Sequence, residues 1–352
     1  MGTKLRRRTR GTGRVMTVRS LLLAIPALWL AVFFALPLLY SLMLSVSEGS
    51  VASGFLSPPD VFTLDNYERV LMQNAMNIRN SLTIGVLATA LAFLIAIPLA
   101  YGIVYHGGRY RNVMMALVLM PFLTSYIIRI ISWQRILGSE GPLVSLLRAL
   151  GIVDEQFTIV GTPFAVVAAL TYQSIPFVFL PVYISFSKQA PALREAAEDL
   201  YSGPWGRNGF WVGAGVGLGM CVLAFFALRF DENDSWLVAV AVILVVVTLC
   251  GALAARFISA TFALVLFPLI SNGLMGAALL SLIPAIGDYV NASLLGNTNT
   301  QMIGNVIQQK YLVQGDFTGA SALAALLIML LLVMIAVYVR IVGAKKVFDY
   351  VG

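Results

Sequence analysis

Few ionisable side chains lie within or at the ends of the long apolar stretches of this chain. Asp288 lies in the run IPAIGDYV and Arg129 in SYIIRIISW. Charges within membrane segments are costly and often mark a pathway or a relay. A carboxylate at Asp288 would favour a cationic solute, although near the interface it could instead cap a helix or pair locally. For Arg129 a structural role is favoured, because a cation in the path would repel such a solute.

Aromatic and amide side chains near the same segments could complete a path for a cation. Tyr172, Gln173, Trp133 and Tyr289 offer cation–π or polar contacts. Aromatic residues at the ends of membrane spans also serve as interface anchors, and this reading stays open for each of them. With Asp288, these four residues are the predicted translocation-path residues.

Motifs for enzymatic chemistry are absent from the sequence. No G-x-x-x-x-G-K-[ST], C-x-x-C, H-E-x-x-H or G-x-S-x-G occurs. His106 is the one histidine, so no histidine-based metal cluster can form, and Cys221 and Cys250 fall in apolar segments where they are expected to be small buried residues. We expect no enzyme, no cofactor and no metal in this chain.

Composition places the chain in a membrane. Hydrophobic residues make up 59% and charged residues only 11%, far below the proportion in soluble domains. Because backbone polar groups must be paired inside lipid, an all-α helix bundle is expected. Eight segments are long and apolar enough to span the membrane: Leu21–Val46, Ser81–Tyr105, Val113–Ile136, Pro163–Phe186, Val212–Arg229, Trp236–Ala255, Phe267–Val290 and Ala320–Val342.

The distribution of basic residues predicts the orientation. Net charge is +7, and seven Lys or Arg fall in residues 1–20. An excess of basic residues marks the cytoplasmic side, so both termini are expected in the cytoplasm of a prokaryotic cell, with the chain in its plasma (inner) membrane. The basic tail could also touch anionic lipid headgroups. This distribution argues against nucleic acid as a partner.

Residues 191–205, PALREAAEDLYSGPW, form a polar interruption between two apolar segments. On the predicted topology this interruption lies at the cytoplasmic face. A short helix there is well shaped to dock into the groove of another protein. A surface amphipathic helix without a docking role is the alternative.

Several stretches together point to a family. They are FTLDNYERVL (62–71), NSLTIGVLATALAFLIAIPLAY (80–101), MPFLTSYIIRIISWQRILGSEGPLVSLLRALGIVD (120–154), IPFVFLPVYISF (175–186), EAAEDL (195–200), FPLISNGLMGAALLSLIPAIGDYVNASLLG (267–296) and IGNVI (303–307). With these the chain resembles the permease subunits of spermidine/putrescine importers of the ATP-binding-cassette (ABC) type, a branch of the type I importers. The resemblance implies a bundle of about six core spans. It also implies two ATPase subunits that carry ATP and Mg, a second permease subunit and an extracytoplasmic solute-binding protein.

The resemblance also assigns roles in the EAA coupling loop. Glu195 would face the rim of the ATPase, Ala196 and Ala197 would allow close approach, and Leu193 and Leu200 would fill its groove. Asp199 belongs to the same motif, and Gly203 would end the helix, although Tyr201 stands where the family has glycine.

The family pattern is interrupted after this loop by two further spans, for a total of about eight. We therefore divide the chain into a basic tail (1–20), a first permease part ending in the coupling loop (21–205), an inserted hairpin (206–260), the rest of the permease domain (261–346) and a C-terminal tail (347–352). The expected function is ATP-driven import of spermidine or putrescine by alternating access. Thiamine, ferric iron or another small solute remains open as the cargo, and a stand-alone secondary transporter or channel is the alternative of a different class.

Overall fold

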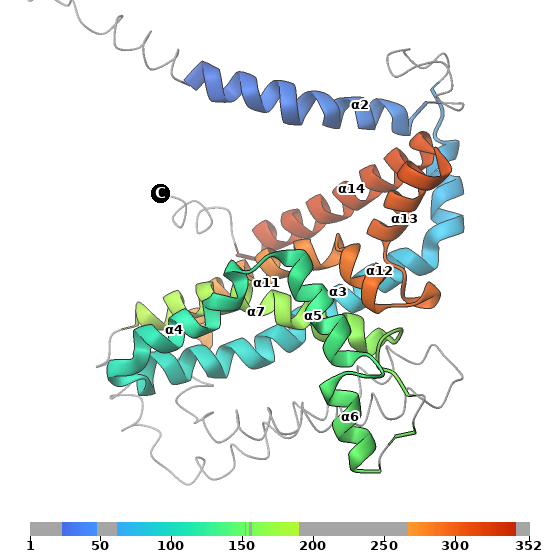
Figure 1. Cartoon of the computed structure of the whole chain (residues 1–352). Helices are drawn as coiled ribbons and strands as arrows, with labels where there is room; N and C mark the ends of the chain where they lie inside the picture. The colour runs from blue at the N-terminus through green and yellow to red at the C-terminus, as the bar shows by residue number, and fades with distance from the viewer. Residues whose placement is uncertain (1–22, 48–61, 152, 155–156, 190–266, 343–352) are drawn as a thin grey trace, which may run out of the picture.

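The computed structural model describes residues 23–47, 62–151, 153–154, 157–189 and 267–342, and these residues are mainly helical (Figure 1). In chain order the elements are η1 (Ala31–Ala35), α2 (Leu36–Ser45), α3 (Asp65–His106), η2 (Gly108–Tyr110), α4 (Arg111–Leu119), η3 (Met120–Leu123), α5 (Tyr126–Leu137), α6 (Pro142–Ala149), α7 (Pro163–Ser187), α11 (Phe267–Ile286), α12 (Val290–Leu295), η6 (Thr298–Thr300), α13 (Ile303–Gln309), η7 (Lys310–Gln314) and α14 (Phe317–Val342).

The core is a three-helix packing of α3, α7 and α11. One face of α3 carries alanine at every fourth position, and these side chains are fully buried: Ala88, Ala92, Ala96 and Ala100. Small residues at this spacing let neighbouring helices approach closely, which is how apolar helices gain packing energy in lipid. Phe179 and Phe186 of α7 and Ile270 of α11 form one core cluster with the last three of these alanines.

Helix α3 contains the predicted second span, Ser81–Tyr105, and begins well before it, at Asp65. Its one residue with non-helical dihedral angles is Asn74, at φ −121° and ψ 19°. The Asn74 amide donates to the carbonyl of Val70 at 2.9 Å, so it competes with the backbone for a helical acceptor. Pro98, farther along α3, keeps helical dihedral angles.

The predicted third span, Val113–Ile136, is broken in the structure. Helical segments Gly108–Leu123 and Tyr126–Ala149 meet at an angle of 94°. The break lies at Thr124 and Ser125, whose ψ angles of 155° and 136° are extended. A straight crossing through this segment is therefore wrong, because hydropathy reports composition and not chain direction.

Proline and glycine lie at the two ends of α6. Pro142 is its first residue, and Gly151, with a positive φ of 69°, follows its end. Within the described ranges, four helices are long and apolar enough to cross a membrane, or up to five if the bent pair counts as one span. The inserted hairpin 206–260 and both cysteines lie outside the described residues.

The N-terminal helix stands apart from the bundle. In Figure 1 it projects away and meets the other helices near the starts of α3 and α14. Most of its large apolar side chains between Leu23 and Leu39 are exposed. Its position therefore depends on contacts near its C-terminal end.

Candidate functional site

Asp288 lies between α11 and α12, inside a cluster of neutral polar side chains. It is 7% exposed. Its Oδ1 accepts the backbone N–H of Asn291 at 2.8 Å, and its Oδ2 accepts the Asn291 side-chain amide at 3.1 Å and the Tyr126 hydroxyl. Both carboxylate oxygens are thus engaged in this conformation.

Gln173 of α7 joins the same cluster through Asn291. The Asn291 amide nitrogen donates to Gln173 Oε1 at 3.0 Å and lies 3.4 Å from the Tyr126 hydroxyl. We call Tyr126, Gln173, Asp288 and Asn291 the carboxylate cluster. Its members come from α5, α7, the α11–α12 turn and α12, so packing of all these elements is needed to assemble it.

The charge of Asp288 has no basic neighbour in the described part of the chain. Asp316 forms ion pairs with Lys310 and Arg69, whereas no described Lys or Arg lies within 4.0 Å of Asp288. A buried carboxylate that is not paired with a cation is costly, even when hydrogen bonds offset part of that cost. The cluster can therefore gain stability from a cation that enters it.

The predicted aromatic residues divide into two groups. The rings of Trp133 and Tyr172 contact each other edge-to-face, with centroids 5.6 Å apart, and Tyr172 is the chain neighbour of Gln173. Tyr289 is 43% exposed, and its backbone carbonyl accepts the Asn305 amide at 2.6 Å. The structure thus connects Gln173 to Asp288 directly, pairs Trp133 with Tyr172, and leaves the Tyr289 side chain at the surface.

Two members of the cluster were missed by sequence reasoning. Asn291 follows Asp288 by three residues, the spacing of an aspartate that caps a helix turn, so local sequence held a signal for it. Tyr126 is 162 positions away from Asp288. No periodicity or local motif predicts such a contact, which forms only because the chain breaks immediately before Tyr126.

Arg129 lies one turn after Tyr126 on α5. Its guanidinium carbon is 5.9 Å from the centre of the Phe122 ring, and its Nε is buried without a hydrogen-bond partner in the described structure. The structural role favoured for Arg129 stays a prediction.

The predicted coupling residues, Leu193, Glu195, Ala196, Ala197, Asp199, Leu200 and Gly203, lie outside the described residues. The end of α7 that leads toward them is described. Arg111 of α4 donates from Nε to the Tyr183 hydroxyl at 2.8 Å and from Nη2 to Ser187 Oγ at 2.6 Å. These bonds fix the last turn of α7 against the start of α4.

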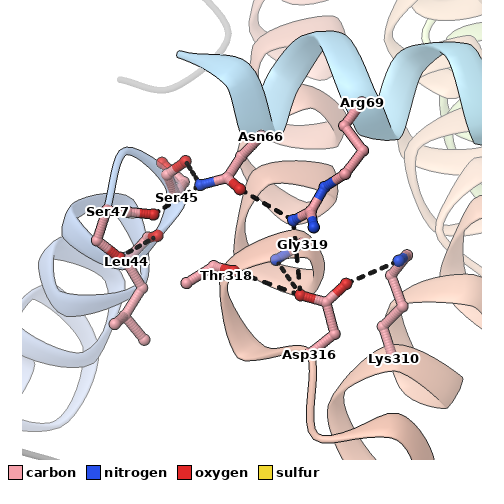
Figure 2. A network of polar contacts seen from close by, with 9 residues as sticks. All are labelled: Leu44, Ser45, Ser47, Asn66, Arg69, Lys310, Asp316, Thr318 and Gly319. Atoms are coloured by element: carbon pink, nitrogen blue, oxygen red, sulfur yellow. Dashed lines mark hydrogen bonds and ion pairs between the residues drawn. The ribbon is translucent and has the colours of Figure 1, made fainter. Parts of the chain in front are cut away.

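A second polar cluster joins the ends of three helices (Figure 2). We call it the three-helix clamp, formed by Ser45, Ser47, Asn66, Arg69, Lys310 and Asp316. Asn66 of α3 donates to the carbonyls of Ser47 at 2.8 Å and Ser45 at 3.3 Å, which ties the end of α2 to the start of α3.

The charged half of the clamp is centred on Asp316. Its Oδ2 accepts Lys310 Nζ at 2.8 Å, its Oδ1 accepts the backbone N–H of Gly319 at 2.9 Å, and Arg69 Nη2 lies 3.8 Å from Oδ1. Partial burial alone would raise the pKa of Asp316, but the hydrogen bonds from Lys310 and Gly319 and the charges of Lys310 and Arg69 outweigh it and lower that pKa. The negative charge of Asp316 is therefore balanced by neighbouring positive charges of the chain, and its role is structural.

Known proteins similar to this chain are membrane permeases. It is 28% identical over 313 residues to the spermidine/putrescine transport system permease protein PotB of Haemophilus influenzae, covering 89% of this chain and 90% of that protein. It is 27% identical over 319 residues to PotB of Escherichia coli, covering 89% and 93%. No family model matches the chain. The resemblance predicted from the sequence is confirmed.

A solved structure shares the fold. The crystal structure of a bacterial ABC transporter involved in the import of the acidic polysaccharide alginate contains a chain that matches with a TM-score of 0.54, covering 95% of this chain and 99% of that one. At 18% identity this likeness concerns the fold alone. It supports the predicted fold class, a helical ABC importer permease bundle.

Proposed function

We propose that this chain is a permease subunit of an ATP-driven importer and that it moves spermidine or putrescine into the cytoplasm. Similarity to spermidine/putrescine permeases over 89% of the chain carries this proposal. The carboxylate cluster agrees with it, since Asp288 is a buried anion with no described basic neighbour. Polyamines are cations, so their ammonium groups are suitable partners for such an anion.

In this proposal the chain conducts solute and does not hydrolyse ATP. Two ATPase subunits supply ATP and Mg, a second permease subunit completes the membrane pathway, and an extracytoplasmic binding protein delivers the solute. The coupling segment 191–205 docks into the ATPase, and alternating access follows from its movement. Both termini lie in the cytoplasm.

Uptake of labelled spermidine by cells with and without the gene tests this function. ATP supply and ion gradients are varied separately, because an ABC importer needs the first and a secondary transporter the second. Gene-dependent uptake that survives collapse of the gradients is the expected result. Uptake that follows the ion gradient would indicate a stand-alone secondary transporter, and uptake of thiamine or ferric iron instead would move the cargo to the alternatives.

Glu195→Ala tests the coupling segment. The substitution removes the carboxylate expected at the ATPase rim but keeps a residue that favours helix. We expect solute-stimulated ATP hydrolysis to fall while the chain still inserts and assembles at the wild-type level. Glu198→Ala is the matched control, since it removes a neighbouring carboxylate of the same segment to which no coupling role is given. Wild-type stimulation in the Glu195 variant would contradict the docking role.

A further inference from the structure

Tyr126 is placed where a helix movement would change the surroundings of Asp288. It is the first residue of α5, directly after the extended residues Thr124 and Ser125, where the two helical segments meet at 94°. Both of these residues are exposed. Rotation about two extended residues can redirect α5 without breaking any helical hydrogen bond.

The Tyr126 hydroxyl is one of only two side-chain donors found for the Asp288 carboxylate in the described structure, the other being the Asn291 amide. Both a hydroxyl and an ammonium group form charge-assisted hydrogen bonds to a carboxylate. Only the ammonium group also carries a positive charge, which compensates the buried negative charge of Asp288. An ammonium group that reached Oδ2 would therefore displace the hydroxyl.

Asn291 supplies an independent sign that the cluster lacks a donor. The residue is 1% exposed, and its Oδ1 is buried with no hydrogen-bond partner among the described residues. Its amide nitrogen donates to Gln173 Oε1 and Asp288 Oδ2, and these two acceptors fix the orientation of the amide. In this orientation Oδ1 has no donor in the described structure. Buried amide oxygens are rarely unpaired, and an ammonium group carries three N–H donors.

We propose that Tyr126 controls access of the solute to Asp288: its hydroxyl occupies Oδ2 in the conformation described here, and an ammonium group of the solute replaces it when α5 swings at Thr124–Ser125. The ammonium then donates to Asp288 Oδ2 and to Asn291 Oδ1. This inference rests on the proposed function, because it takes the solute to be an amine. It adds two residues, Tyr126 and Asn291, to the path.

Labelling of Asp288 tests this role without requiring transport. A hydrophobic carbodiimide adds to an accessible protonated carboxyl group, and peptide mass spectrometry measures the rate at Asp288 in membranes containing the assembled transporter. Tyr126→Phe removes only the hydroxyl, which donates to Oδ2 and stabilises the ionised form of Asp288. The protonated form that the reagent attacks becomes more populated and more accessible, so we expect labelling to be about tenfold faster than in the wild type, the scale of one hydrogen bond to a charged group. Spermidine should protect Asp288 in this variant.

Tyr67→Phe is the matched control. The Tyr67 hydroxyl is likewise hydrogen-bonded to another side chain, Ser45 Oγ at 2.7 Å, but at the three-helix clamp and not at Asp288. Labelling of Asp288 in this control should equal that in the wild type. Equal acceleration in both variants would mean general loosening of the bundle and would overturn the proposal, as would an unchanged rate in Tyr126→Phe.

Asn291→Ala is a second variant in case Tyr126→Phe is not recovered in the membrane. It removes the other side-chain donor to Oδ2 and leaves the Tyr126 hydroxyl in place, so labelling should rise by less than about tenfold.

Wild-type protein that takes up no spermidine would contradict the proposed function. If the transporter imports spermidine but spermidine does not slow the fast labelling of Tyr126→Phe, the proposal that an ammonium group replaces the hydroxyl would be overturned.

Discussion

Asp288 and Asp316 make the same local contact but have different electrostatic neighbours. Each accepts the backbone N–H of the residue three positions later, at 2.8 and 2.9 Å, in the first turn of the following helix. Asp316 then faces Lys310 and Arg69, whereas Asp288 faces a hydroxyl and an amide.

This difference separates a structural carboxylate from one suited to a ligand. The negative charge of Asp316 is satisfied within the chain, so the clamp holds helix ends together and has little to offer a solute. The negative charge of Asp288 is solvated by neutral donors alone in the described structure, and a cation from outside can still improve its electrostatic energy. Local sequence cannot separate the two cases, because the decisive neighbours come from other helices.

The largest effect is expected from Asp288→Asn. The amide retains an oxygen for the Asn291 backbone N–H, and its nitrogen can donate to the Tyr126 hydroxyl. Only the bond from the Asn291 side-chain amide is lost, so the fold should persist. Loss of the charge should lower kcat/KM for spermidine by roughly tenfold to a hundredfold, the range for a hydrogen bond to a charged group. Uptake per assembled transporter measures this effect. Unchanged uptake would remove Asp288 from the path.

Asp316→Asn should lower the stability of the protein and leave its uptake of spermidine nearly unchanged, the opposite of Asp288→Asn. It leaves Lys310, whose side chain is 11% exposed, without its carboxylate, and we expect a loss of about 1–3 kcal/mol of stability. The thermal midpoint of the purified protein reports this loss. Uptake per assembled molecule should remain near the wild-type value, and a selective loss of cation transport would contradict the structural role of the clamp.

The stabilisation by Asp316 should depend on pH. Its pKa is lowered in the folded protein, so the folded state binds the proton less readily than the unfolded state does. The contribution is therefore complete above the ordinary aspartate pKa of about 4 and is lost as pH falls through the lowered value. The difference in thermal midpoint between wild type and Asp316→Asn should shrink below about pH 4. If this difference in thermal midpoint stayed constant from pH 7 to below about pH 4, stability would not depend on the protonation of Asp316 and the prediction would be refuted.

The smallest effect is expected from Arg69→Gln. The Arg69 side chain is 46% exposed and lies 3.8 Å from Asp316, and glutamine can still donate to Asn66. Exposed ion pairs contribute little, so stability should fall by no more than about 0.5–1 kcal/mol. Thermal midpoints in low and high salt measure it. A loss as large as that of Asp316→Asn would show that Arg69, and not Lys310, neutralises the carboxylate.

Sequence reasoning predicted the helical membrane fold and identified Asp288 as a candidate path residue. These features depend on composition and on neighbours close in the chain. It did not reach the break before Tyr126 or the contact of Tyr126 with Asp288, since both depend on how distant helices pack. It also did not predict the departure from helix at Asn74 in α3, where the Asn74 side chain competes for a backbone carbonyl.

The most direct test of the account compares spermidine uptake by wild type, Asp288→Asn and Asp316→Asn at equal amounts of assembled transporter. ATP is supplied and ion gradients are collapsed. We predict ATP-dependent uptake in the wild type, near-normal uptake by Asp316→Asn and a loss of at least about tenfold in Asp288→Asn. Equal losses in the two variants, or no loss in Asp288→Asn, would contradict the distinction between a structural and a solute-binding carboxylate.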